Sequence, residues 1–261
     1  MGLSELMVLS AATILIYMTF IFFLAVKSKN NSLADVAWGP GFVIVAVVTL
    51  IAAGGYHAEQ VIVTLLVFFW GVRLAIRIFR RNRGKGEDYR YVKWRGEWGK
   101  GWVWRSYLQV FLLQGLFMWL ISLPILFVNA RGAEGLTTLA ILGILVWVIG
   151  FAFEATGDFQ LDSFLKVTAN RGKIMDNGLW RYSRHPNYFG EVLQWWGIFI
   201  ISLSVPGAIV GIIGPLTITF LILRVSGIPL LEKKMAENPA FQEYKARTSV
   251  FIPWFPQRNT K

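Results

Sequence analysis

Residues 6–26 read LMVLSAATILIYMTFIFFLAV, a run of 21 residues without a charged side chain. A helix of about 20 apolar residues is long enough to cross the hydrocarbon core of a bilayer. No Lys or Arg precedes the run and no small-residue cleavage site follows it, so we interpret it as a retained span and not as a signal peptide. This stretch therefore predicts an integral membrane protein.

Similar stretches continue along the chain. Four more runs carry charges only at Arg73, Arg77 and Glu154, and they are residues 37–55, 61–79, 106–130 and 136–157. The uncharged run 192–223 is too long for one crossing, and Pro206-Gly207 marks a turn that divides it into two. The sequence therefore predicts an all-α fold with seven transmembrane helices.

The composition supports this class. The 261 residues are 55% hydrophobic and only 16% charged, whereas ordinary soluble domains are about 25% charged. The absence of Cys excludes disulfide scaffolds, zinc–thiolate sites and thiol nucleophiles, and two His residues are too few for a His-cluster metal site. We therefore expect no metal site.

Positive charges predict the orientation. The loops on one side carry Lys27 and Lys29, eight Lys or Arg between residues 80 and 100, five between 166 and 184, and seven from 224 to 261. These are 22 residues, whereas the other side has Arg131 alone. Because cytoplasmic loops are enriched in Lys and Arg, we predict an N-terminus outside and a C-terminus in the cytoplasm.

The same partition accounts for the net charge of +11 without nucleic acid as a partner. Most of the basic run at residues 80–100 is expected to contact anionic membrane lipids. We find no internal repeat, low-complexity tract or linker, so we expect a single membrane domain over residues 1–261.

Charged residues within spans indicate where a site lies, because each costs roughly 2.5–3.5 kcal/mol to insert unless it has a partner or a wet cavity. Arg73 and Arg77 are four residues apart and share a helical face, and Glu154 and Asp158 have the same spacing. All four are predicted near the cytoplasmic face. They fit a structural salt-bridge network between spans as well as a ligand site.

The segment 157–191, GDFQLDSFLKVTANRGKIMDNGLWRYSRHPNYFGE, is the longest polar stretch on this face. Pro186 is suited to the first turn of the helix that follows. Asn187, Glu191 and Gln194 then share one helical face, and such a polar face is not expected to meet lipid.

Arg181 and Arg184 precede this helix start. Guanidinium groups beside the free backbone amides of a helix N-terminus favour an anion. We therefore predict that a phosphate-bearing cofactor binds to this cytoplasmic loop, although His185 alone also fits a capping or interfacial residue. No GxGxxG turn follows any strand-like run, so a Rossmann domain is not expected.

RHPNYFGE at residues 184–191, preceded by GLWRYS at 178–183, resembles a bacterial branch of the steroid 5α-reductase family. The surrounding superfamily includes sterol reductases and isoprenylcysteine carboxyl methyltransferases, which share the RHPNY element. The resemblance extends over about 35–256, with supporting matches in DVAWGP at 35–40, NRGKGEDYR at 82–90 and GIPLLEKK at 227–234.

The resemblance implies a reductase in a bacterial inner membrane that binds NADPH on the cytoplasmic side. It reduces the carbon–carbon double bond of a lipophilic enone, such as a 3-oxo-Δ4 steroid, by hydride transfer to the β-carbon. No obligatory protein partner is implied. The family residues that hold the cofactor match Arg73, Asn82, Lys85, Asp158, Lys173 and Asn187.

Further cofactor residues are expected in or near the same loop. Lys166, Arg171, Arg184 and His185 are candidates for the pyrophosphate, the ribose and the 2′-phosphate. Arg77, Tyr182 and Glu191 complete the expected set, and Asn187 and Glu191 are expected to face the nicotinamide amide.

The residues that hold the substrate carbonyl are less well matched. Where family members have a Tyr this chain has Trp70, and Asp35, just before Trp38, is the nearest substitute for their Glu. We therefore name Asp35, Trp38, Trp70 and Glu191 as candidate catalytic residues, with Tyr89 and Tyr91 as further places to seek a proton donor.

Two other functions stay open. A membrane methyltransferase that uses S-adenosylmethionine is suggested by the shared RHPNY element, although the chain has only Glu232 where paired Glu residues are expected near the last helix. A non-catalytic lipid-binding protein is suggested by the missing carbonyl-binding pair.

Overall fold

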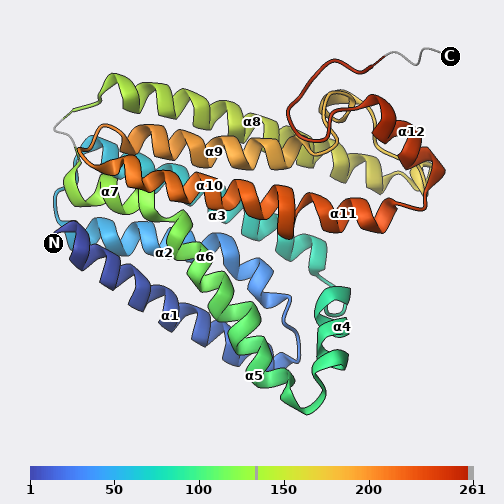
Figure 1. The fold of residues 1–261 in the computed structure, drawn as a ribbon, viewed down its shortest axis with the longest axis horizontal. Coiled ribbons are helices and arrows are strands. Elements are labelled where there is room, and N and C mark those ends of the chain that lie inside the picture. The colour runs from blue at the N-terminus through green and yellow to red at the C-terminus, as the bar shows by residue number, and fades with distance from the viewer. Residues whose placement is uncertain (133–134, 258–261) are drawn as a thin grey trace. The chain divides into compact units, whose positions relative to one another are not determined.

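The computed structural model describes residues 1–132 and 135–257, and the described residues form helices, turns and loops without a strand (Figure 1). Two basic residues counted above, Arg258 and Lys261, lie outside the described residues.

Five helical stretches of the described chain are long and apolar enough to cross a membrane. They are α1 (Leu3–Ser28), α2 (Leu33–Ala53), α3 (Ala58–Asn82), α8 (Thr138–Lys166) and the stretch Ala208–Met235. The last is assembled from η5 (Ala208–Ile212), α10 (Ile213–Phe220), η6 (Leu221–Val225) and α11 (Ile228–Met235). The described residues thus confirm two parts of the predicted fold class, an all-helical fold and several membrane-length helices.

A sixth span is present if a bent pair of helical stretches crosses as one. The first stretch, Tyr89–Ile121, contains α4 (Tyr89–Trp98), η1 (Gly99–Gly101), α5 (Trp102–Ser106), η2 (Tyr107–Leu112) and α6 (Leu113–Ile121). It meets α7 (Leu123–Arg131) at an angle of 47°. Pro124 stands in the first turn of α7, where its missing N–H breaks no helical hydrogen bond.

The predicted turn at Pro206-Gly207 also exists. It follows α9 (Pro186–Ser202), which is 17 residues long and is not among the membrane-length helices. Gly207 has φ +82°, in the left-handed region that glycine adopts without strain. The seventh crossing and the orientation in the membrane stay predictions.

The chain forms two compact units. Unit 1 comprises residues 1–141 and 199–214, and unit 2 comprises residues 142–198 and those from 215 onward. The remaining short elements, η3 (Thr168–Asn170), η4 (Gly178–Arg181) and α12 (Pro239–Arg247), belong to unit 2.

Unit 1 is built around a close crossing of α2 and α3. A Cβ added to Gly39 would lie 2.4 Å from the carbonyl oxygen of Gly71, and one added to Gly71 would lie 2.7 Å from that of Gly39. The two backbones therefore touch, a packing mode that small residues permit between membrane helices. Around this crossing, Phe42, Val45 and Val67 are fully buried.

Candidate functional site

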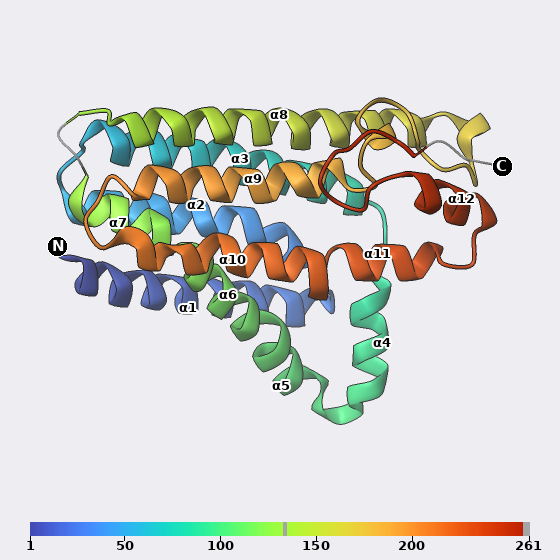
Figure 2. The same ribbon diagram turned by 45° about the horizontal axis from the view of Figure 1, so that its top comes forward.

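Glycines bring α8 and α9 of unit 2 into backbone contact. A Cβ at Gly190 would lie 2.4 Å from both the Gly150 oxygen and the Glu154 nitrogen, and one at Gly197 would lie 2.7 Å from the Gly143 oxygen. No side chain fits at such distances, so the helices pack directly along two turns. Figures 1 and 2 show α8 and α9 running side by side. This crossing determines which polar residues face one another.

Two polar pairs follow from this register. The Asn187 side-chain amide donates to the Asp158 carboxylate at 3.0 Å, and the Gln194 amide donates to the Glu154 carboxylate at 2.6 Å. Glu191 lies on α9 between these pairs and is buried. The structure thus brings the polar face of α9 onto the acidic face of α8, and the amide–carboxylate pair of Asn187 and Asp158 stands at the loop end of both helices.

Arg184 and His185 are engaged with a carboxylate of α11. The Arg184 Nε donates to Glu232 Oε1 at 2.8 Å, and the His185 Nε2 lies 3.3 Å from the same oxygen. The Lys245 ammonium group lies 3.2 Å from Glu232 Oε2. The Arg184 Nη1 also donates to the backbone carbonyls of Lys245 and Thr248. Two cationic side chains and an imidazole, from two other segments, therefore converge on one carboxylate.

His185 is almost fully buried within this cluster, and its ring stacks on Tyr188 with centroids 5.8 Å apart. Burial lowers the pKa of His185, and the hydrogen bond to Glu232 opposes that effect only in part. The imidazole is therefore neutral near pH 7, and its contact with Glu232 is a hydrogen bond from Nε2–H to a carboxylate.

The C-terminal segment, residues 249–257, is attached by its backbone to the chain that precedes α9. The Arg184 N–H donates to the Ser249 carbonyl at 2.8 Å, and the Trp254 N–H donates to the Tyr182 carbonyl at 2.9 Å. These two hydrogen bonds attach the loop before α9 to the C-terminal segment.

A short turn of 3₁₀ helix, η4, connects this loop to α8. The Trp180 indole donates to the Gly157 carbonyl at 2.9 Å, and the Leu179 N–H donates to the Gln160 side chain at 3.0 Å. Gly157 is the neighbour of Asp158, so η4 is attached directly beside the Asn187–Asp158 pair. The next residue, Arg181, is exposed.

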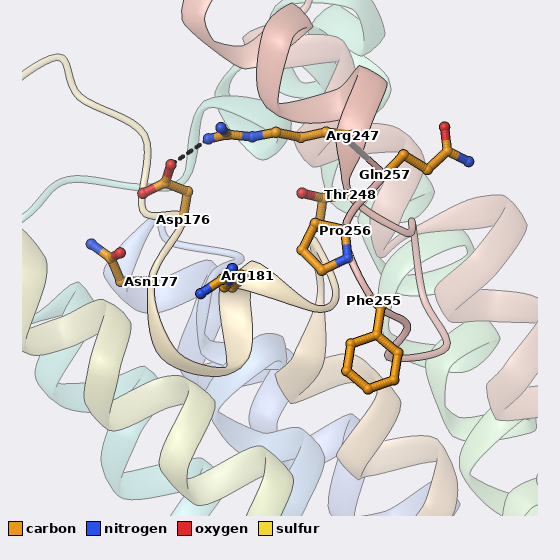
Figure 3. Close-up of a pocket in the computed structure, with 8 residues that line it drawn as sticks. All are labelled: Asp176, Asn177, Arg181, Arg247, Thr248, Phe255, Pro256 and Gln257. Carbon is orange, nitrogen blue, oxygen red and sulfur yellow. Dashed lines mark hydrogen bonds and ion pairs between the residues drawn. The ribbon is translucent and has the colours of Figure 1, made fainter. Parts of the chain in front are cut away.

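Arg181 contributes to a pocket of about 630 Å³ between η4, the end of α12 and the C-terminal segment (Figure 3). The Arg247 guanidinium is paired with the Asp176 carboxylate at one side of this pocket. Phe255 lines it with a side chain that is 77% exposed. The full lining comprises Asp176, Asn177, Arg181, Arg247, Thr248, Phe255, Pro256 and Gln257.

The remaining cofactor residues predicted in unit 2 lie at the surface. Lys166 ends α8, and Arg171 and Lys173 lie in the loop after η3. Tyr182 is exposed and its ring meets Phe255 edge-on, with centroids 6.1 Å apart. The predicted polar segment 157–191 begins within α8 and ends within α9, so its non-helical part is shorter than the sequence suggested.

Unit 1 contains Asp35, a candidate catalytic residue, in a network of its own. The Tyr91 hydroxyl donates to Asp35 Oδ1 at 2.6 Å, and the Arg90 guanidinium lies 2.9 Å from Asp35 Oδ2. The Arg90 Nε also donates to Asp88 at 2.9 Å. The network joins the start of α2 to the start of α4.

Aromatic and basic candidates of unit 1 lie on α2 and α3. Trp38 and Trp70 each meet Phe42 edge-on, with centroids 5.2 Å and 5.5 Å apart. Arg73 and Arg77 are half-buried one turn apart on α3. The last two candidates follow at its end, where Asn82 is its final residue and Lys85 donates its N–H to the Asn82 carbonyl at 3.0 Å.

A model of the family described as "Protein of unknown function (DUF1295)" matches residues 21–248, which is most of the chain. The chain belongs to the DUF1295 family. The matched residues include every predicted catalytic and cofactor-binding position in both units.

This DUF1295 protein is also similar to curated proteins. It is 25% identical over 112 residues to 3-oxo-5-alpha-steroid 4-dehydrogenase 1 of Rattus norvegicus, covering 43% of this chain and 40% of that protein. The human enzyme of the same name is 34% identical over 68 residues, or 26% of each chain. The chain thus spans well under half the length of the steroid dehydrogenases it matches.

A longer match joins it to the uncharacterized protein C594.04c of Schizosaccharomyces pombe, which is 26% identical over 206 residues, covering 68% of this chain and 59% of that protein. No solved structure matches the chain significantly. These similarities support the resemblance to the steroid 5α-reductase superfamily, whereas the bacterial origin stays a prediction.

Several residues of the site have no assigned role in the sequence-based prediction. Glu232 appeared there only as an isolated acid, and Tyr244, Arg247 and the C-terminal segment did not appear at all. The Tyr244 hydroxyl donates to the backbone carbonyls of Trp180 and Ser183, and burial raises its pKa. The available signal is an acid, Glu232, directly before two Lys residues. The partners of Glu232 and Tyr244 in the loop before α9, His185 and Trp180, lie 47 and 64 residues away in the chain.

Proposed function

We propose that this protein is a multi-pass membrane reductase that uses NADPH to reduce the activated double bond of a lipophilic enone. The observation that carries the proposal is the Asn187–Asp158 pair, at the end of the α8–α9 crossing, with Glu191 buried one turn further along α9. Amide and carboxylate groups at a helix end are suited to the carboxamide of a nicotinamide. The similarity to 3-oxo-5-alpha-steroid 4-dehydrogenases supports this chemistry.

The surrounding residues fit a dinucleotide. Lys166, Arg171 and Lys173 are exposed cations in the adjoining loop, where they would meet a pyrophosphate. Arg184 and His185 have a different proposed role, because Glu232 already binds both side chains. We assign them to positioning: they keep the start of α9, and with it Asn187, in place.

Bound NADPH supplies the hydride that adds to the β-carbon of the enone, and a proton adds to the α-carbon. Polarising the carbonyl oxygen makes that β-carbon electrophilic. Of the candidate catalytic residues, Asp35 accepts a hydrogen bond from the Tyr91 hydroxyl. The pair, and not the acid alone, is therefore the group to test for polarising the carbonyl. Trp38 and Trp70 are proposed to line the substrate site, and Glu191 to face the nicotinamide.

We further propose seven crossings, with the N-terminus outside and the C-terminus in the cytoplasm. The sixth crossing is then the short α9, and the fourth is the bent pair that ends in α7. In this orientation the loop end of α8 and α9 faces the cytoplasm, where NADPH is available. The bacterial inner membrane is the proposed location on the strength of the resemblance alone.

The test is turnover by the full-length protein purified in detergent. We expect consumption of NADPH when a 3-oxo-Δ4 steroid or another lipophilic enone is added, with the saturated ketone as product by mass spectrometry. NADPH binding without turnover on a broad enone panel would favour the lipid-binding alternative. Binding of S-adenosylmethionine without any response to NADPH would replace the proposal with a methyltransferase.

A further inference from the structure

Arg181 and Arg184 are close in the sequence but differ in their surroundings. Arg184, three residues after Arg181, has its guanidinium bound by Glu232 and by two backbone carbonyls. Arg181 is exposed and lines the pocket. Of the two arginines in the sequence WRYSRH, only Arg181 therefore presents its charge to this open cavity.

Arg247 reaches the same cavity from the end of α12. Its guanidinium is held by Asp176, and its backbone carbonyl accepts from the Gln257 N–H at 2.9 Å. Both side chains of the ion pair are more than one-third exposed, so a ligand reaches them from the pocket. A phosphate monoester carries about −1.5 to −2 charges at pH 7, more than the single charge of Asp176, and two arginines suit such a dianion.

Phe255 completes the site. The Phe255 ring is 77% exposed, in a part of the protein that we place in water. It lines the pocket beside the two arginines and meets the Tyr182 ring edge-on. Nucleic-acid bases stack readily on such aromatic rings. A cavity of about 630 Å³ is of the size that small-molecule sites have, roughly 300–1,000 Å³.

We infer that this pocket binds a 2′-phosphorylated adenosine, with Arg181 and Arg247 on the phosphate and Phe255 against the adenine. The inference rests on the proposed function, and it names the part of the protein that distinguishes NADPH from NADH. The pocket is joined to the Asn187–Asp158 pair by η4, because Trp180 is bonded to Gly157 and Arg181 is the next residue. One dinucleotide would then extend from α9 to the C-terminal segment.

The experiment measures binding, not turnover, by energy transfer from the 12 Trp residues to the reduced nicotinamide. Reduced nicotinamide mononucleotide, which lacks the adenosine half, serves as the second ligand. We expect Arg181→Gln and Arg247→Gln each to weaken NADPH binding about tenfold, the value of one charge-assisted contact, and to leave mononucleotide binding unchanged. Phe255→Leu is expected to weaken NADPH binding several-fold in the same selective manner.

Competition separates the phosphate from the rest of the nucleotide. In the wild type, 2′,5′-ADP should displace NADPH whereas 5′-AMP should not, and the two Gln variants should lose this difference. Arg131→Gln, an exposed arginine of unit 1, is the matched control and should bind NADPH like the wild type. Thermal unfolding of each variant checks that the fold is intact.

The outcomes are distinguishable. NADPH bound equally well by the wild type and by folded Arg181→Gln and Arg247→Gln variants would overturn this inference and leave the proposed function standing. Equal affinity of the wild type for NADPH and NADH would also overturn it. Absence of any nicotinamide binding to the wild type would overturn the proposed function itself.

Discussion

Each of the two units contains a half-buried carboxylate that contacts an arginine and an aromatic side chain, but the two arrangements differ. In unit 1, Asp35 receives one guanidinium and one phenol from neighbouring residues of α4. In unit 2, Glu232 receives an arginine, a histidine and a lysine that come from two segments. The first joins two helix starts, whereas the second organises the loop from which α9 begins. The same chemistry therefore supports a helix junction in one unit and a candidate ligand site in the other.

The largest effect is expected from Glu232→Gln. Removing the charge leaves the buried Arg184, the buried His185 and the exposed Lys245 without their shared anion, and breaking the buried pair with Arg184 costs roughly 3–5 kcal/mol. Thermal or denaturant unfolding of the detergent-solubilised protein measures the loss. The exposed Glu237 supplies the matched control, Glu237→Gln, which should unfold like the wild type. Equal stability of Glu232→Gln and the control would show that the cluster is not structural.

Asp35→Asn is expected to have a smaller effect. The new amide still accepts the Tyr91 hydrogen bond, and only the ion pair with Arg90 is lost, so we expect a decrease of about 1–3 kcal/mol in the free energy of unfolding. Glu97→Gln, which breaks only an exposed ion pair with Lys93, should cost less than about 0.5 kcal/mol. Enone turnover of Asp35→Asn should fall as well, and unchanged turnover would remove Asp35 from the catalytic candidates.

Acidic pH is expected to lower the stability of the two units over different pH ranges. Burial lowers the pKa of His185, so protons bind more readily to the unfolded chain and stability falls as the pH drops below about 6.5. Burial raises the pKa of Asp88 in unit 1, but hydrogen bonds from Arg90 outweigh this effect, so that its pKa is lowered overall. The stabilisation that Asp88 contributes is therefore lost only below about pH 4. The unfolding temperature should therefore decline between about pH 7 and 5, and His185→Gln should flatten that part of the profile. A decline unchanged in His185→Gln would assign it to another group.

Much of the fold could be predicted from local sequence. Uncharged runs gave the positions of α1, α2, α3 and α8, because apolar length alone determines a membrane-length helix. The pairing of Asn187 with Asp158 was also accessible in part, since helical spacing put Asn187, Glu191 and Gln194 on one face. The bend before α7 and the 17-residue length of α9 were not predicted, because they depend on packing and not on hydropathy.

The arginines of the loop before α9 show what local sequence cannot predict. Sequence reasoning placed Arg184 among the phosphate ligands, because it stands before a helix N-terminus. Its actual partners, Glu232 and the carbonyls of Lys245 and Thr248, lie 48 to 64 residues further along the chain. Nothing local indicates them, and neither does anything local indicate that Arg247 meets Asp176 across 71 residues. Contacts of this kind follow from the tertiary fold alone.

The central claim, that the Asn187–Asp158 pair holds the nicotinamide end of NADPH, is tested most directly by titrating NADPH into the wild type and Asn187→Ala. Asn187→Ala removes a hydrogen bond to the buried Asp158 carboxylate, so the free energy of unfolding should fall by about 1–3 kcal/mol, and binding is compared at a temperature where thermal unfolding shows the variant to be folded. The account predicts saturable energy transfer in the wild type and binding weakened about tenfold or more in Asn187→Ala, for NADPH and for reduced nicotinamide mononucleotide alike. Equal affinity of the wild type and the folded variant for both ligands would contradict it.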